Sequence, residues 1–166
     1  MTIWRQFWRF CADCVRADQG VSIARKACYP NDAMLTNRDD FERYLESSGR
    51  PFSKLDDATL LVTLARGQPP AVLRVHAPLA VIQVEICNVE FQKPTDDSAF
   101  YRKLLELNAT DLLHASYGLA GNRVELSAAL ELEHLDENEL EAALSDVALG
   151  LVNHVPQLRQ MITEKA

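Results

Sequence analysis

The pattern of apolar and polar positions predicts a sheet in the middle of the chain. Residues 79–89 alternate, with Gln83 and Glu85 placed among isoleucines and valines. A period of two is typical of a strand that packs one face on helices and turns the other face to solvent. Residues 58–65 and 71–77 are rich in aliphatic and β-branched side chains. We therefore predict an antiparallel meander of three strands, with Glu85 as a solvated position rather than a catalytic one.

A hairpin is predicted farther along the chain. Residues 114–118 and 123–132 have strand character, and Ala120-Gly121-Asn122 between them supplies residues that tolerate turn conformations. Phe52–Asp57, before the first strand, is predicted to be a connector. The sheet should then contain about five strands.

Three helices are predicted around these strands. The first begins after Asn37 and the second after Asp96, since both residue types accept hydrogen bonds from the free N–H groups of a helix start. The third has a capping box, with Asp136 at the N-cap and Glu139 three residues later. An apolar stripe at helical spacing follows, which favours packing on the sheet over a dimerisation face. Pro156 should bend or end this helix.

The resulting order is helix, three strands, helix, two strands, helix. It predicts an α+β domain in which an antiparallel sheet of about five strands packs against helices. A chain of 166 residues fits one such domain. We place this domain at residues 34–166 and treat residues 1–33 as an N-terminal extension.

Charge separates these two parts of the chain. Residues 1–33 hold five Lys/Arg and three Asp/Glu, whereas residues 34–166 hold twelve and twenty-one, for a net charge of −7 overall. A body this acidic repels polyanions, so nucleic-acid binding is not expected. No apolar run has the roughly 20 residues needed to cross a bilayer, and a secretory signal is not evident at the N-terminus. We therefore expect a cytoplasmic protein.

The extension carries aromatic and basic residues at helical spacing. Trp4, Phe7 and Trp8 share one stripe, and Arg9 lies largely outside it. One interpretation is a short interfacial helix with aromatics at a membrane surface and arginines near lipid phosphates. The alternatives are a helix packed on the domain, a loosely ordered extension, or an upstream mis-start with Met34 as the natural first residue.

The cysteines do not indicate a metal or a disulfide framework. Cys11 and Cys14 form a single C-x-x-C, and Cys28 and the scattered histidines supply no second pair at the spacing that structural zinc requires. No strand precedes the motif, as a thioredoxin-type redox site would need. Cys87 lies in an apolar strand and should be a buried thiol. No cofactor is predicted.

Sequence signatures of catalysis are also missing. The chain has no glycine-rich phosphate loop, no G-x-S-x-G and no H-E-x-x-H. The acidic pairs Asp39-Asp40, Asp56-Asp57 and Asp96-Asp97 stand where helix caps and turns are predicted. We therefore predict that the protein is not an enzyme.

The order of elements resembles the type III secretion chaperone-like fold, which YbjN-type proteins share. Similar local segments are Leu104–Asn108, the hairpin around Tyr117–Arg123, and Leu135-Asp136 before the last helix. More narrowly, Leu35–Leu158 looks like the small bacterial YjfI-like family of unknown function. These motifs are structural, so no functional residue is carried over.

The resemblance implies a protein-binding function. It suggests a non-enzymatic adaptor or regulator, homodimeric, linked to a phage-shock-protein-A-type membrane-stress system with a coiled-coil partner. A secretion-type chaperone that holds an effector segment is the first alternative. A peripheral membrane protein that uses Trp4, Phe7, Trp8 and Arg9 is the second.

Overall fold

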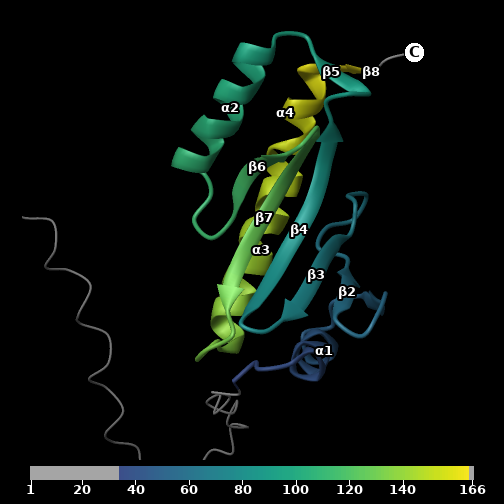
Figure 1. Cartoon of the computed structure of the whole chain (residues 1–166), viewed down its shortest axis with the longest axis vertical. Coiled ribbons are helices and arrows are strands. Elements are labelled where there is room, and N and C mark those ends of the chain that lie inside the picture. Colours follow the sequence, from purple (N-terminus) through teal and green to yellow (C-terminus); the bar gives the residue numbers. More distant parts are fainter. Residues whose placement is uncertain (1–33, 165–166) are drawn as a thin grey trace, which may run out of the picture. The chain divides into compact units, whose positions relative to one another are not determined.

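The computed structural model describes residues 34–164 of the chain. These residues form an α+β fold in which helices lie against an antiparallel sheet (Figure 1). In chain order the elements are α1 (Arg38–Ser47), β1 (Phe52–Lys54), β2 (Thr59–Val62), β3 (Ala71–His76), β4 (Leu79–Asn88), β5 (Gln92–Pro94), α2 (Asp97–Thr110), β6 (Ser116–Ala120), β7 (Arg123–Glu131), α3 (Glu137–Asn153), α4 (Val155–Gln160) and β8 (Ile162–Glu164).

The main sheet has six strands in the order β1-β2-β3-β4-β7-β6. The predicted meander and hairpin are confirmed, and β4 joins them by pairing with β7 over nine register positions. The prediction that Phe52–Asp57 is only a connector is wrong, because Phe52–Lys54 pairs with β2 as an edge strand. This strand has only three residues and no alternation of buried and exposed positions, so its sequence does not indicate a strand.

The hairpin strand β6 begins two residues later than predicted. Residues 113–115 are held instead as a loop, because the backbone N–H groups of Leu113, His114 and Ala115 all donate to one carboxylate oxygen of Asp146 on α3, at 2.7–3.0 Å. A side chain thirty-one or more residues away therefore determines where the strand starts. β6 then runs to Ala120, and Gly121-Asn122 makes the turn.

The helix starts follow the predicted caps. Asn37 accepts hydrogen bonds from the N–H groups of Asp39 and Asp40, and Asp96 accepts one from Ala99. The capping box of Asp136 and Glu139 is present at the start of α3. As predicted, the last helix is interrupted near Pro156: α3 ends at Asn153, and α4 contains the proline in its first turn.

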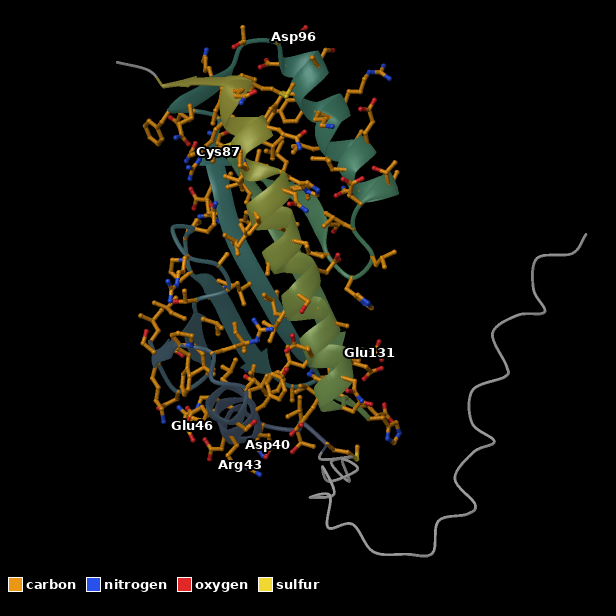
Figure 2. All side chains as sticks on the ribbon, turned by 180° about the vertical axis from the view of Figure 1, so that it is seen from behind. Asp40, Arg43, Glu46, Cys87, Asp96 and Glu131 are labelled. Atoms are coloured by element: carbon orange, nitrogen blue, oxygen red, sulfur yellow. The ribbon has the colours of Figure 1, made fainter. Side chains whose placement is uncertain are left out.

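The core lies between one face of the sheet and the helices. Figure 1 shows α3 and α4 behind β4 and β7, and Figure 2, from the opposite side, shows α3 in front of the sheet. Gly150 permits this close approach, because a Cβ built there would lie 2.8 Å from Cδ2 of Leu126 on β7. Fully buried side chains come from the inward positions of both layers, including Leu60, Leu73, Ile82, Leu126, Leu140, Leu144 and Leu151.

A small second sheet, which was not predicted, pairs β5 with β8. Gln92–Pro94 and Ile162–Glu164 are too short and too polar to show a strand period. The backbone N–H of Thr95 also donates to the carbonyl of Met161, at 2.8 Å. The segment after α4 is thereby fixed to the connection between β4 and α2.

Candidate protein-binding surface

The side of the main sheet that faces away from α3 is the candidate functional surface. Strand side chains alternate, so the residues between the core positions of β2, β3, β4 and β7 all point to this side. We call this side the open face, since no helix among the described residues covers it in Figure 1. It comprises Leu61, Val72, Arg74, His76, Leu79, Val81, Gln83, Glu85, Arg123, Glu125, Ser127, Ala129 and Glu131.

Apolar side chains occupy the middle of the open face. Leu61 pairs with Val72 across β2 and β3, and Val81 pairs with Ala129 across β4 and β7. Leu79, at the start of β4, is 39% exposed. Side chains of this kind offer contact area to an apolar partner without providing any reactive group.

A diagonal chain of polar side chains crosses the same face. Arg74 donates to Oε1 of Gln83 at 3.5 Å, and Nε2 of Gln83 donates to Glu125. Glu125 also accepts a hydrogen bond from Nε of Arg123 at 3.0 Å. Glu125 is 9% exposed, so these contacts satisfy a carboxylate that is almost buried.

Glu85 stands directly opposite Glu125 in the register of β4 and β7. Like charges placed opposite one another in a sheet are unfavourable, but Glu85 is exposed to solvent and a β-bulge follows it, between Glu85 and Cys87. The prediction that Glu85 is an outward, solvated side chain agrees with this position.

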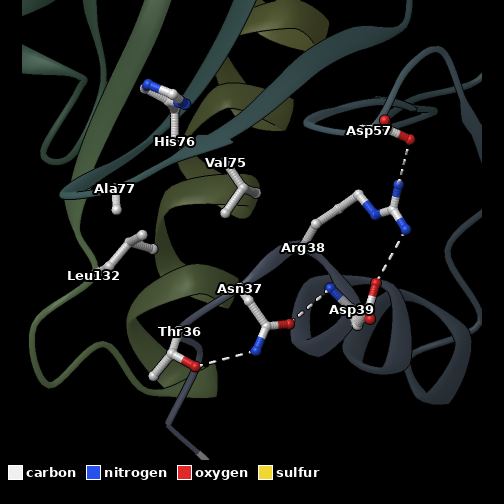
Figure 3. Close-up of a pocket in the computed structure, with 9 residues that line it drawn as sticks. All are labelled: Thr36, Asn37, Arg38, Asp39, Asp57, Val75, His76, Ala77 and Leu132. Carbon is white, nitrogen blue, oxygen red and sulfur yellow. Dashed lines mark hydrogen bonds and ion pairs between the residues drawn. The ribbon is translucent and has the colours of Figure 1, made fainter.

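A pocket of about 460 Å³ opens at one end of the open face. Figure 3 shows polar side chains from the start of α1 on one side and Val75, Ala77 and Leu132 across from them. His76 belongs both to the pocket lining and to the open face. The pocket therefore lies at the end of the sheet beside the open face, between the start of α1 and the β3–β4 turn.

Carboxylates surround the single guanidinium at the pocket wall. Arg38 lies 3.0 Å from Asp39, 2.9 Å from Glu42 and 4.0 Å from Asp57 (Figure 3 draws the first and last of these contacts). The hydrogen bond with Asp39 is the main cause that raises the pKa of Arg38. The start of α1 already has Asp39 and Asp40 in its first turn, so the pocket is not arranged to bind an anion.

Other titratable side chains serve the fold. His154 is buried, with Nδ1 3.1 Å from the Tyr117 hydroxyl and Nε2 3.2 Å from Asp111. Cys87 is a buried free thiol on β4 whose pKa is raised by burial and, secondarily, by Glu85. Figure 2 shows its position on the sheet. The described residues contain no group of three His, Cys, Asp or Glu side chains that could hold a metal ion.

The residues that the sequence pattern singled out in the extension lie outside the described residues. This applies to the membrane or partner contacts Trp4, Phe7, Trp8 and Arg9, and it also applies to Cys11, Cys14 and Cys28. Their roles stay predictions. Within residues 34–164, none of the helices combines the length and the apolar character needed to span a bilayer.

The sequence pattern identified the outward direction of Gln83 and Glu85 but missed most of the open face. Glu125 and Arg74 are charged residues in strands, which indicates exposure but not that Gln83 connects them. The pocket was missed because its walls come from the start of α1, the β3–β4 turn and the residue after β7. No local signal joins positions so far apart in the sequence.

An antiparallel sheet with one helix-covered face and one mixed apolar and polar face is suited to binding another polypeptide. The sequence profile of the CesT_Tir_1 family matches residues 34–164. The chain therefore belongs to the CesT_Tir_1 family, a type III chaperone family. Among curated proteins, none matches the sequence.

Solved structures with the same fold agree with the predicted fold group. YbjN from E. coli is 13% identical, with a TM-score of 0.53 over 76% of this chain and 95% of that one. A chain of the heterodimeric ExoU–SpcU complex from the type III secretion system of Pseudomonas aeruginosa is 20% identical, with a TM-score of 0.54 over 69% and 93%. The chaperone-like, YbjN-like fold group is thus confirmed, and the narrower YjfI-like resemblance stays a prediction.

Proposed function

We propose that this protein holds an extended segment of a partner protein on the open face and in the adjoining pocket, and that it acts by contact rather than by catalysis. The observation that carries this proposal is the open face itself, where apolar side chains are flanked by a hydrogen-bonded polar chain. An extended peptide has alternating side chains, so one side of it can meet Leu61, Val72 and Val81.

The pocket supplies an anchor at one end of this path. Its volume of about 460 Å³ is large enough for a single large side chain. A segment that crosses the open face toward His76 arrives beside the pocket, because His76 is also one of the pocket residues. One anchored side chain accounts for more affinity than the surrounding contacts do.

A secretion-type chaperone that binds an effector segment is the form of this proposal that the family and the ExoU–SpcU complex support. The adaptor function linked to a phage-shock-protein-A-type system rests on the resemblance and stays a prediction. The two forms differ in what is bound, a secreted protein or a coiled-coil membrane-stress protein. Mass spectrometry of proteins that co-purify with the native chain distinguishes them.

The test of the open face compares two matched substitutions. Leu79→Gln changes an apolar side chain on the open face, whereas Leu149→Gln changes an exposed one on α3. Once a co-purifying partner is in hand, Leu79→Gln should weaken its binding by about tenfold, which corresponds to ~1.4 kcal/mol, and Leu149→Gln should not. Equal affinities for both variants, each with wild-type melting behaviour, would overturn the proposal.

A homodimer is the second part of the proposal, supported by the outer side of α2. Tyr101, Leu105 and Ala109 share a hollow of about 600 Å³, and Leu105 is 68% exposed. An antiparallel second copy of α2 would cover Leu105 and place Arg102 near Glu106 of the other helix. Light scattering should give a dimer mass for the wild type and a monomer mass for Leu105→Asp. A wild-type monomer would contradict the dimer and leave the open-face proposal unaffected.

A further inference from the structure

β7 is longer than its neighbour β6, so the last part of β7 has a free edge. The ladder between the two strands ends where Ser116 pairs with Ser127, whereas β7 continues to Glu131. Figure 1 shows β7 extending past the end of β6. The residues that would continue β6 are turned away, because Asp146 binds the N–H groups of the loop before it. Within the described part of the chain, residues 128–131 therefore have a partner strand only on the side of β4.

Two residues of β7 direct their backbone groups to this free edge. The N–H of Leu132 donates to the carbonyl of Pro78 at 2.9 Å, so the even-numbered residues of β7 turn their backbone groups to β4. Ala129 and Glu131, at odd positions, turn theirs to the free edge. Among the described residues, none donates to their carbonyls or accepts from their N–H groups. An edge of this kind is a template for pairing with another strand.

A pocket of about 300 Å³ lies against the same residues. Its lining includes the carboxylates of Glu131, Glu133 and Glu139, all exposed, and neither a lysine nor an arginine. The side chain of Glu131, labelled in Figure 2, makes no hydrogen bond or ion pair with the described residues. A basic side chain is therefore the complement of this pocket.

The same charges argue against a second copy of the chain at this edge. Two identical edges pair about a two-fold axis, so a second copy would bring its own Glu131 and Glu133 against those of the first. Like charges placed opposite one another in a sheet are unfavourable. A partner of different sequence, with basic side chains, meets no such repulsion.

We propose that the free edge of β7 binds an extended segment of a partner protein, and that this segment carries a lysine or arginine side chain. The backbone of the segment pairs with Ala129 and Glu131, which are successive outward positions of one strand. The basic side chain enters the pocket and meets the carboxylate of Glu131. This site uses backbone groups and a pocket that the function proposed above leaves unused, so the inference does not rest on that function.

The experiment measures, by fluorescence anisotropy, how tightly the full chain binds a labelled peptide in which lysine and valine alternate. Glu131→Lys should weaken binding by about tenfold, since it replaces the carboxylate with a cation at the edge. Glu46→Lys changes the net charge equally at an exposed position of α1, away from Glu131 in Figure 2, and should bind as the wild type does. A peptide with glutamate in place of lysine should bind about tenfold more weakly. Equal affinities of the two variants, or of the two peptides, would overturn the proposal.

Hydrogen exchange in the wild type tests the backbone pairing without any substitution. The lysine peptide should slow the exchange of the amides of Ala129 and Glu131 by about tenfold, and the amide of Leu130, which faces β4, should change little. Unchanged exchange at Ala129 and Glu131 would show that charge alone holds the peptide. Equal protection before the peptide is added would show that a second copy or another segment of the chain occupies the edge. Either result would overturn the proposal.

Discussion

Asp146 is a buried carboxylate that joins α3 to the loop before β6. It is 7% exposed, and one of its oxygens accepts hydrogen bonds from the backbone of three successive residues, Leu113, His114 and Ala115. This loop also leads to Tyr117 on β6, whose backbone N–H and carbonyl both bond to the side-chain amide of Asn108. The hydrogen bonds from this loop to Asp146 therefore fix the position of β6 relative to α3.

We expect Asp146→Ala to destabilise the protein strongly. It leaves three N–H groups without their acceptor, and an unsatisfied buried donor costs about 1–3 kcal/mol, so the free energy of unfolding should fall by at least ~3 kcal/mol. Urea denaturation measures this loss. Asp97→Ala, at an exposed position in the first turn of α2, is the control and should cost under ~1 kcal/mol. Equal losses for the two variants would show that the three bonds do not matter.

We expect Glu141 to make the stability of the protein depend on pH in the acid range. Burial would raise the pKa of Glu141, but hydrogen bonds from Tyr44, Ser145 and Arg50 outweigh that effect and lower the pKa below its ordinary value of 4.5. A lowered pKa in the folded state means that the bonds to α1 stabilise the protein fully above about pH 4.5. This stabilisation is lost as the pH falls through the lowered pKa.

The measurement is the free energy of unfolding of the wild type and of Glu141→Gln between about pH 7 and about pH 3. The difference between the two proteins should be largest at neutral pH and should shrink as the wild-type carboxylate becomes protonated. A difference that stays constant over this range would show that the charge of Glu141 contributes nothing to the contact between α1 and α3.

Among the elements, α3 lies close against β7 at Gly150. A methyl group there would lie 2.8 Å from Cδ2 of the fully buried Leu126. Overpacking in a core costs about 1–3 kcal/mol, whereas alanine gains about 1 kcal/mol over glycine in a helix. We therefore expect Gly150→Ala to lower the free energy of unfolding by about 1 kcal/mol.

Thermal and urea unfolding test this expectation, with Gly118→Ala as the control. Gly118 has open space where its Cβ would lie and no positive φ, so alanine should be neutral there or slightly stabilising. If Gly150→Ala were as stable as Gly118→Ala, the approach of α3 to β7 would be looser than the structure shows.

The same elements show how far sequence patterns reach. The alternation in β4 and β7 and the caps at Asn37, Asp96 and Asp136 depend on neighbouring residues, and all of them were predictable. β1 and β5 were not, because their partner strands, rather than their own periods, define them. The open face was partly predictable from alternation. Its pocket and the bonds from Asn108 to Tyr117 depend on the tertiary structure.

At the scale of the whole molecule, the predicted contrast between an acidic body and a basic, aromatic N-terminal segment leads to one expectation. If Trp4 and Trp8 contact membranes, the full chain should co-sediment with anionic liposomes, and Trp4→Ser/Trp8→Ser should not. Phe91→Ser changes an aromatic side chain of the body that is 62% exposed, and it should leave sedimentation unchanged. Absence of sedimentation for the full chain would remove the membrane hypothesis.

The pairing of β4 with β7 has a consequence for how the chain acquires its fold. The β2–β3–β4 meander and the β6–β7 hairpin each form from neighbouring segments, whereas β4 and β7 are separated by β5, α2 and β6. Closing so long a loop before its contacts form is slow. We therefore expect the transition state for folding to consist of the two preformed halves meeting along β4 and β7. Substitutions at Ile82 or Ala128, which face each other there, should slow folding, and substitutions in β1 should mainly speed unfolding.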